Sequence, residues 1–260
     1  MNVLLIAIIL GAIQGLTEFL PVSSSGHLAI FEKVFGLSLK NSLIFDVTTH
    51  FATLLSLVFV LRKKLFNNIK SEKLTFLKSF YPYFLATTPA LFFGAVLSFS
   101  GLVEKIYKNN KLVSINMIIT GLVFLLFARE KKLKENKITN KKIFTAGIFQ
   151  ALGILPGISR SGITTFGGIF SGLKKKDALK VSFNLFFPIV FLAVLKELFD
   201  FLKEFQNYSE NLLPIISGSI SAFVFGTISA SFLLKFFEKI GLKPFGVYLI
   251  IFGTLTFLFV

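Results

Sequence analysis

The sequence predicts an all-α integral membrane protein, built as an inverted-repeat bundle of six transmembrane helices and two re-entrant helical hairpins. Three observations support this fold class. Of the 260 residues, 54% are hydrophobic and only 16% are charged, whereas an ordinary soluble domain carries about 25% charged residues. The apolar residues are grouped in blocks close to the ~20 residues that a membrane-spanning helix needs. Two of these blocks are interrupted by polar residues, and the two halves of the chain repeat the same landmarks.

The apolar blocks give the expected order of elements. A first apolar run, 3–13, leads into the polar stretch 14–28, and a short amphipathic segment follows at 28–40. The block 143–170 is interrupted by a proline, an arginine and several glycines, so it is expected to form a second broken hairpin rather than a clean span. The six expected spans are 43–61, 80–100, 112–128, 181–201, 212–234 and 245–260.

The positive charges support this arrangement. If both broken elements return to the side from which they entered, 20 Lys and Arg residues fall in connecting segments on one side and 6 on the other. The positive-inside rule assigns the richer side to the cytoplasm, so the first hairpin enters from outside and the second from the cytoplasm. The net charge of +15 is therefore attributed to topology, and we expect no nucleic-acid partner.

The chain also repeats itself in register. Gln14 precedes Gly26 by twelve residues, as Gln150 precedes Gly162. Each half has one broken hairpin and three spans, and this odd number of crossings places the halves in opposite orientations. Interrupted segments at corresponding places of inverted halves are typical of a binding site near the membrane midplane. We therefore expect a single membrane domain, 1–260, with inverted repeats at 1–128 and 143–260.

The two interrupted stretches carry residues that are costly in a membrane. Residues 14–28 read QGLTEFLPVSSSGHL and include Glu18 and His27, while residues 150–165 read QALGILPGISRSGITT and include Arg160. A charge at the bilayer centre costs about 2.5–3.5 kcal/mol on insertion scales, so such residues are expected to be paired or functional. We expect the two loops to face each other and to bind a phosphate together.

Gln14 and Glu18 are one helical turn apart and therefore face the same way. A carboxylate and an amide oxygen suit a hard divalent cation, Mg²⁺ or Ca²⁺, with waters and phosphate oxygens as the remaining ligands. The alternative is that Glu18 caps its own helix end, or pairs with Arg160, without any metal ion.

The serines and glycines that follow each Leu-Pro pair favour a phosphate cradle. Hydroxyls and backbone N–H groups at a helix N-terminus form an anion site, although one serine in each loop is enough for an ordinary N-cap. Arg160 would grip phosphate with two donors at once, unless it forms a structural salt bridge with Glu18. The expected phosphate-binding residues are Ser23, Ser25, Gly26, Ser159, Ser161, Gly162 and Thr164.

The candidate catalytic residues are Glu18, Ser24, His27 and Arg160. His27 is expected as a general acid or base, or as a nucleophile, because histidine titrates near neutrality. Ser24 is a candidate nucleophile that His27 would activate. The sequence leaves open whether Ser24, His27 or a metal-bound water attacks phosphorus. Asp46 and His50, four residues apart on the next span, are weaker candidates for lining the pocket.

At these motifs the sequence resembles a known family. GLTEFLPVSSSGHL at 15–28 and PGISRSG at 156–162 are similar to the two signatures of the undecaprenyl-diphosphate phosphatase family, the bacitracin-resistance proteins of bacteria. The acidic motif of the family, Glu/Gln-x-x-x-Glu, corresponds to Gln14 and Glu18 in its Gln variant. The serine, histidine and arginine of the family correspond to Ser24, His27 and Arg160.

The resemblance implies a multi-pass enzyme of the bacterial cytoplasmic (inner) membrane that removes the terminal phosphate from undecaprenyl diphosphate. The product, undecaprenyl phosphate, is the lipid carrier for peptidoglycan precursors, and removal of the free diphosphate would confer bacitracin resistance. The resemblance further implies a divalent cation as cofactor and a polyprenyl diphosphate lipid as partner within the bilayer. The oligomeric state stays open between a monomer and a homodimer.

Other functions compete with this interpretation. A transporter or flippase of polyprenyl phosphates would use the same inverted repeats and phosphate site, but it would not need a His/Ser pair beside that site. The type 2 phosphatidic-acid phosphatase family also uses a Ser-Gly-His segment, but its Lys-x6-Arg-Pro motif is missing from this sequence. A structural membrane protein would leave Glu18 and Arg160 unexplained.

Overall fold

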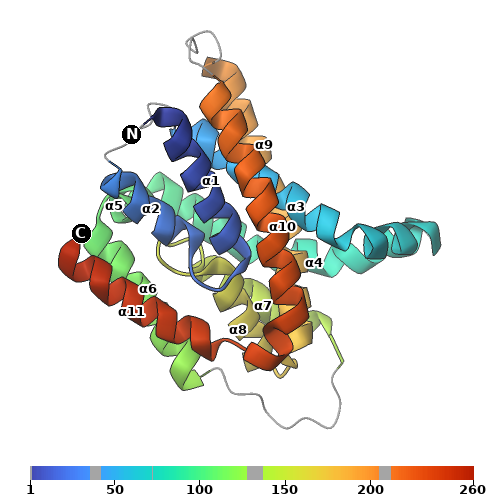
Figure 1. Ribbon diagram of the computed structural model, residues 1–260. Coiled ribbons are helices and arrows are strands. Elements are labelled where there is room, and N and C mark those ends of the chain that lie inside the picture. Colours follow the sequence, from blue (N-terminus) through green and yellow to red (C-terminus); the bar gives the residue numbers. More distant parts are fainter. Residues whose placement is uncertain (1, 36–41, 72, 128–136, 205–211) are drawn as a thin grey trace.

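The computed structural model describes residues 2–35, 42–71, 73–127, 137–204 and 212–260 (Figure 1). These residues form helices joined by turns, and no strand occurs among them. The predicted all-α class is therefore confirmed. In chain order the helices are α1 (Val3–Phe19), α2 (Ser24–Val34), α3 (Ser42–Ser71), α4 (Lys73–Phe99), α5 (Leu102–Tyr107), α6 (Asn110–Phe127), α7 (Asn140–Leu152), α8 (Arg160–Phe170), α9 (Lys175–Glu204), α10 (Leu213–Ile240) and α11 (Lys243–Phe259).

Five helices in the described part of the chain, α3, α4, α6, α9 and α10, are long and apolar enough to cross a bilayer. Large apolar side chains such as Phe92, Phe99 and Ile220 are 75%, 94% and 60% exposed. Water would penalise so much exposed apolar surface, whereas lipid accepts it. The chain is therefore a multi-pass membrane protein. α1 and α11 are apolar as well but have only 17 residues each, so length and composition alone supply five of the six expected spans.

The helices extend beyond the apolar blocks that predicted them. α4 begins at Lys73, ahead of the expected start at residue 80, and α10 continues to Ile240 rather than ending at residue 234. Hydropathy marks the part of a helix that lipid covers, while the backbone hydrogen bonds continue into charged turns outside it. The short helix α5 was not predicted, because its six residues are too few to show a periodic pattern.

Both expected helix breaks are present. A turn containing a Leu-Pro pair separates α1 from α2, and another separates α7 from α8. Ser23 caps α2 by accepting a hydrogen bond of 3.2 Å from Gly26 N. Ser159 caps α8 in the same way, with a bond of 3.3 Å from Gly162 N. A capping side chain satisfies an N–H group that helix geometry leaves free, so α2 and α8 start as new helices instead of continuing the preceding ones.

Helices from the first half of the chain pack against helices from the second half. α1 lies along α10, α7 lies along α4, and α6 and α11 lie side by side (Figure 1). α3 packs against α9 and α10, and α9 packs against α3 and α4. Matching α1, α2, α3, α4 and α6 with α7, α8, α9, α10 and α11 converts each of these pairings into another of the set. The helix contacts are therefore unchanged when the two sets of helices are interchanged.

Small residues let the paired helices approach closely. A Cβ on Gly11 of α1 would fall on the backbone carbonyl of Gly218 of α10. A Cβ on Gly147 of α7 would likewise fall on the carbonyl of Ala86 of α4. Close contacts through glycine and alanine are typical of membrane helices, which lack a hydrophobic drive for association in lipid. Here these contacts fix the two helices, α1 and α7, that end at the breaks.

Candidate active site at the two helix breaks

The last turn of α1 holds a buried carboxylate. Glu18 is 5% exposed, and its Oε2 accepts a hydrogen bond of 2.9 Å from Gln14 Nε2. The expectation that these two side chains face the same way is confirmed. Gln14 is fully buried, and its own Oε1 has no hydrogen-bond partner. A buried acceptor without a partner is costly, so a further group that binds this oxygen would be stabilised there.

A tight turn brings Ser24 back onto Glu18. Ser24 Oγ donates a hydrogen bond of 2.6 Å to Glu18 Oε2. The turn passes through Ser23, whose φ of 69° is the one positive value for a non-glycine residue in the described chain. Such a conformation costs on the order of 1–3 kcal/mol and is found most often at functional sites. Ser24 therefore begins α2 with its hydroxyl held against a carboxylate.

Arg160, the first residue of α8, forms an ion pair with Glu18 Oε1. Its guanidinium lies over the ring of Phe186 of α9, 4.1 Å from the ring centre. Gly153 leaves room for this residue, since a Cβ there would lie 2.6 Å from Arg160 Cα. Thr164 donates its hydroxyl to the Arg160 backbone carbonyl at 2.7 Å, within α8. The ion pair that the sequence offered as an alternative for Glu18 is thus present.

The two breaks also touch through their turns. Ser161 Oγ donates a hydrogen bond of 3.1 Å to Leu20 O. Gly162 packs against Pro21, because a Cβ on this glycine would lie 2.8 Å from the Pro21 Cβ. The expectation that the two interrupted stretches face each other is confirmed. These contacts fix the first break relative to the second and so hold the carboxylate and the guanidinium together.

The serines of the predicted phosphate cradle form matching pairs. Ser25 Oγ lies 3.5 Å from Ser23 Oγ, and Ser161 Oγ lies 3.4 Å from Ser159 Oγ. The two capping serines are buried, while Ser25 is half-buried. A phosphate-binding role for these hydroxyls stays a prediction, because the contacts that they make in the protein are with other groups of the two loops.

His27, expected as the acid or base, has partners other than Glu18 at both ring nitrogens. Its Nδ1 lies 2.8 Å from Ser23 O, and its Nε2 lies 2.6 Å from the hydroxyl of Tyr248 on α11. The ring stacks on Phe252 with 4.5 Å between centres. A ring nitrogen that already accepts a hydrogen bond must give it up before acting as a base. Sequence reasoning missed Tyr248, because nothing in an apolar helix singles out one tyrosine.

His50 is the histidine beside the carboxylate. Its Nε2 lies 3.7 Å from Glu18 Oε2, and its Nδ1 lies 2.7 Å from the backbone oxygen of Asp46. The sequence ranked His50 below His27 because His27 belongs to the serine-rich motif. The signal that favours His50 is its position inside an apolar span, where an ionisable residue needs a partner.

The family model for bacitracin resistance protein BacA matches residues 7–255. The chain belongs to the BacA family. Curated relatives named undecaprenyl-diphosphatase include proteins of Carboxydothermus hydrogenoformans, 36% identical over 95% of this chain and 94% of the relative, and of Persephonella marina, 36% identical over 98% of each. The relative from Thermosipho melanesiensis is 38% identical over 96% of this chain and 97% of its own length.

The divalent cation that the BacA family implies fits the residues of this site in part. In the described ranges, no group of three or more His, Cys, Asp or Glu side chains could hold a metal ion. Glu18 Oε2 and the unpartnered Gln14 Oε1 nevertheless offer two oxygen donors from adjacent turns of α1. Mg²⁺ is often bound by only one or two carboxylates, with waters and substrate phosphates as its other ligands. The donors present therefore suit a cation that a phosphorylated substrate helps to hold.

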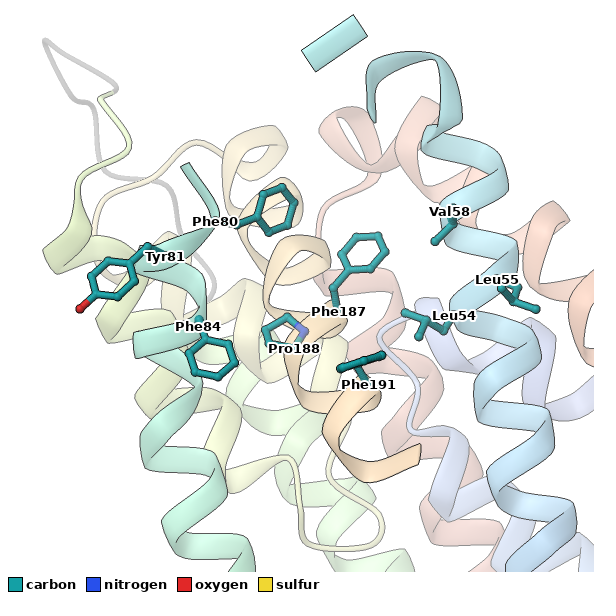
Figure 2. Close-up of a pocket in the computed structure, with 9 residues that line it drawn as sticks. All are labelled: Leu54, Leu55, Val58, Phe80, Tyr81, Phe84, Phe187, Pro188 and Phe191. Carbon is teal, nitrogen blue, oxygen red and sulfur yellow. The ribbon is translucent and has the colours of Figure 1, made fainter. Parts of the chain in front are cut away.

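An apolar cavity of 510 Å³ lies between α3, α4 and α9 (Figure 2). On α3, Leu54 of the cavity wall is one helical turn from His50, and on α9, Phe187 directly follows Phe186, on which Arg160 lies. Two helices, α3 and α9, therefore contribute residues both to the cavity wall and to the surroundings of Glu18 and Arg160. The lining residues of the cavity are Leu54, Leu55, Val58, Phe80, Tyr81, Phe84, Phe187, Pro188 and Phe191.

Proposed function

We propose that this chain is an undecaprenyl-diphosphatase, which hydrolyses undecaprenyl diphosphate to undecaprenyl phosphate and inorganic phosphate. Relatives with that name match nearly the whole chain at 36–38% identity. The observation that carries the proposal is the contact of one buried carboxylate, Glu18, with both the hydroxyl of Ser24 and the guanidinium of Arg160. A nucleophile, a base and a cation at one point are what phosphoryl transfer requires. The activity recycles the lipid carrier for peptidoglycan synthesis and so confers bacitracin resistance.

Arg160 binds the terminal phosphate in this mechanism. Arginine keeps its charge in a buried site and holds phosphate oxygens with two donors. Before substrate arrives, Glu18 Oε1 and the face of Phe186 hold the guanidinium in place. An anionic phosphate competes with Oε1 for the same donors, so substrate binding weakens the ion pair and leaves Glu18 a stronger base. The serines and glycines of both loops, with Thr164, complete the proposed phosphate contacts.

Ser24 attacks the terminal phosphorus. As its Oγ forms the new P–O bond, its proton moves along the 2.6 Å hydrogen bond to Glu18 Oε2. The bridging P–O bond breaks, and undecaprenyl phosphate leaves with the bonding electron pair and takes the proton from Glu18. The terminal phosphate stays on Ser24 as a phosphoserine. Ser24 is therefore the nucleophile and Glu18 the general base and acid.

Water completes the cycle. Its oxygen bonds to the phosphorus of the phosphoserine while Glu18 accepts one of its protons. The P–O bond to Ser24 breaks, Glu18 returns the proton to Ser24 Oγ, and inorganic phosphate is released. His27 holds the first turn of α2 through Ser23 and Tyr248, and in this way positions Ser24.

A divalent cation, Mg²⁺ or Ca²⁺, is part of the proposal. Glu18 Oε2 and Gln14 Oε1 are the oxygens that would hold it, and this chain has an amide where other members of the family carry a second carboxylate. When bound, such a cation neutralises negative charge on the diphosphate and on the leaving phosphate.

For the arrangement in the membrane, we propose the one that the sequence predicts. α11 lies beside α6, which is long enough to span, and we take α11 as the sixth span. The pairs α1–α2 and α7–α8 are the two re-entrant hairpins, and the halves 1–128 and 143–260 are the inverted repeats. The membrane is the bacterial cytoplasmic (inner) membrane. All the proposed catalytic residues come from one chain, so the mechanism does not depend on a homodimer.

The cavity between α3, α4 and α9 accommodates part of the prenyl tail. The tail is a branched hydrocarbon, and apolar walls attract it through dispersion contacts. The helix α9 carries both Phe186, on which Arg160 lies, and Phe187 of the cavity wall, so a lipid with its head group at Arg160 can extend its first prenyl units along α9 to the cavity. A polyprenyl diphosphate is therefore the substrate class. The transporter alternative is not favoured, because the relatives are named for hydrolysis.

Phosphate release tests the proposal. Purified protein in detergent is given undecaprenyl diphosphate with Mg²⁺, with Ca²⁺ and with a chelator, alongside the Arg160→Ala variant. The expected result is metal-dependent release of inorganic phosphate that the variant loses, while the variant keeps its helical circular-dichroism spectrum. Tight binding of the lipid without phosphate release under any condition would contradict the proposal and favour a carrier.

A further inference from the structure

His50 and Glu18 lie side by side without a hydrogen bond between them. The Nε2 of His50 is 3.7 Å from Glu18 Oε2, beyond the 2.7–3.2 Å of an N–H···O hydrogen bond. His50 belongs to α3 and Glu18 to α1, so two separate helices bring these atoms together. The His50 side chain is 36% exposed, whereas that of Glu18 is 3% exposed. The pair therefore brings a nitrogen of a partly exposed side chain next to an oxygen of a buried one.

The hydrogen bond at the other nitrogen fixes the tautomer of His50. Its Nδ1 lies 2.7 Å from the backbone oxygen of Asp46, and a carbonyl oxygen only accepts, so Nδ1 carries the proton. In the neutral ring Nε2 then has a free lone pair, and it faces the carboxylate. Metal-binding histidines almost always have this form, with one N–H bonded to a carbonyl or carboxylate and the other nitrogen on the metal.

The charges at the site favour a cation at this place. Glu18 and Arg160 pair with each other and cancel. A lone pair on Nε2 and a carboxylate oxygen attract no third negative group, whereas a diphosphate head group brings several negative charges. Gln14 Oε1, one turn of α1 before Glu18, is buried without a partner. A nitrogen donor of α3 and an oxygen donor of α1 therefore lie beside each other, and a second oxygen donor of α1 is one helical turn away.

We infer that His50 Nε2 is a metal ligand, and that Glu18, Gln14 and His50 form a mixed nitrogen and oxygen site for one divalent cation. This site deepens the proposed function, because it supplies the cation of the phosphatase. It also changes the metal expected. Imidazole suits Zn²⁺, whereas carboxylate, carbonyl and water oxygens suit Mg²⁺ and Ca²⁺. A site that contains His50 Nε2 therefore binds Zn²⁺ more tightly than Mg²⁺ or Ca²⁺.

The two histidines of the chain make a direct test possible. Protein labelled with ¹⁵N-histidine, in detergent micelles, is titrated with Zn²⁺ alone while the imidazole nitrogens are followed by NMR. The expected result is a saturable change at the His50 Nε2 signal and no change at His27, whose Nε2 is bonded to Tyr248. Isothermal titration of Zn²⁺ and Mg²⁺ into the same protein is expected to give a tighter dissociation constant for Zn²⁺.

Variants separate the ligand from its neighbours. His50→Gln is expected to weaken Zn²⁺ binding at least tenfold, which is about 1.4 kcal/mol. His27→Gln is the matched control and should keep the affinity, and Glu18→Gln should lose it. The melting temperature without metal checks that each variant is folded. The titration of the wild-type protein tests whether His50 binds Zn²⁺ without any variant, so its result holds even if a variant does not fold.

Three results would overturn the inference: a Zn²⁺-dependent change at His27 only, no change at either histidine up to millimolar Zn²⁺, or equal affinity in His50→Gln. The titration uses no lipid, so it is independent of the proposed activity. Phosphate release by a protein whose His50 signal does not change with Zn²⁺ would refute His50 as a metal ligand and support the proposed activity. A Zn²⁺-dependent change at His50 without phosphate release would support the metal ligand and refute the proposed activity.

Discussion

Ser24 Oγ donates a 2.6 Å hydrogen bond to Glu18 Oε2 across the break between α1 and α2. The strained backbone at Ser23 folds the chain back so that this contact forms. A hydroxyl bonded to a carboxylate is the arrangement that a serine nucleophile needs, because the carboxylate can take its proton during attack. In the proposed mechanism Glu18 therefore takes the proton of Ser24, the role that the sequence led us to expect of His27.

Replacing Ser24 tests that assignment. Ser24→Ala removes the nucleophile, and we expect kcat for phosphate release to fall about 10²–10⁴-fold, the usual size of such effects. Because Ser24 is only half-buried, the melting temperature should change little. Ser217→Ala on α10, whose hydroxyl donates to Leu213 O of the same helix, is the matched control, and its kcat should stay within about threefold of wild type. A near-normal kcat in Ser24→Ala would mean that water attacks directly.

The sequence predicted much of this site. The spacing of Gln14 and Glu18 and the two breaks are local patterns, and the internal repeat of the chain predicted that the two loops meet. The proximity of His50 to Glu18 could not be predicted, because the two residues lie on different helices and only packing brings them together. Tyr248 was missed for the same reason, since its contact joins residues at opposite ends of the sequence.

The fold shows the same division between local and long-range information. Hydropathy predicted the apolar blocks and the breaks, because lipid sets both. Helix ends were less accurate: the backbone of α4 stays helical from Lys73, through charged residues that hydropathy places outside the membrane. The pairings of α1 with α10 and of α4 with α7 depend on close contacts at Gly11 and Gly147, and a single sequence does not say which helix a glycine will meet.

The ion pair between Glu18 and Arg160 should be tested by a double-mutant cycle. Breaking a buried pair from one side leaves an uncompensated charge, which costs about 3–5 kcal/mol. Glu18→Gln and Arg160→Gln should therefore each lower the free energy of unfolding in detergent by roughly this amount. The double variant should lose clearly less than the sum of the two. Additive losses would show that the two side chains do not interact.

The cavity between α3, α4 and α9 should affect kcat/KM for substrates that carry a prenyl tail. Leu55 lines the cavity but is 44% exposed, so Leu55→Trp fills space there without disturbing the core. We expect kcat/KM for undecaprenyl diphosphate to fall about tenfold, or 1.4 kcal/mol. The loss should be smaller for inorganic diphosphate, which has no tail. Leu126→Trp on α6, an exposed position outside the cavity, is the control, and an equal loss there would argue against the cavity.

Helix packing at Gly11 should limit stability. A Cβ at this position would fall on the carbonyl of Gly218, so Gly11→Ala forces α1 away from α10. We expect a loss of about 1–3 kcal/mol in the free energy of unfolding, the usual cost of overpacking. At Gly94 a new Cβ would meet only Ile154 Cδ1 at 3.2 Å. Gly94→Ala should therefore be neutral or stabilising, because alanine favours helix. Equal effects of both changes would contradict the predicted packing.

The phosphoserine is the most direct test of the central claim. Undecaprenyl diphosphate labelled with ³²P in the terminal phosphate is mixed with excess purified protein and metal ion, quenched in acid within a turnover, and digested for mass spectrometry. We predict label on the peptide that contains Ser24, a rise and fall of that label with time, and no label in Ser24→Ala. Rapid release of phosphate with no labelled peptide at any time would contradict the account, because Glu18 would then be activating water and not Ser24.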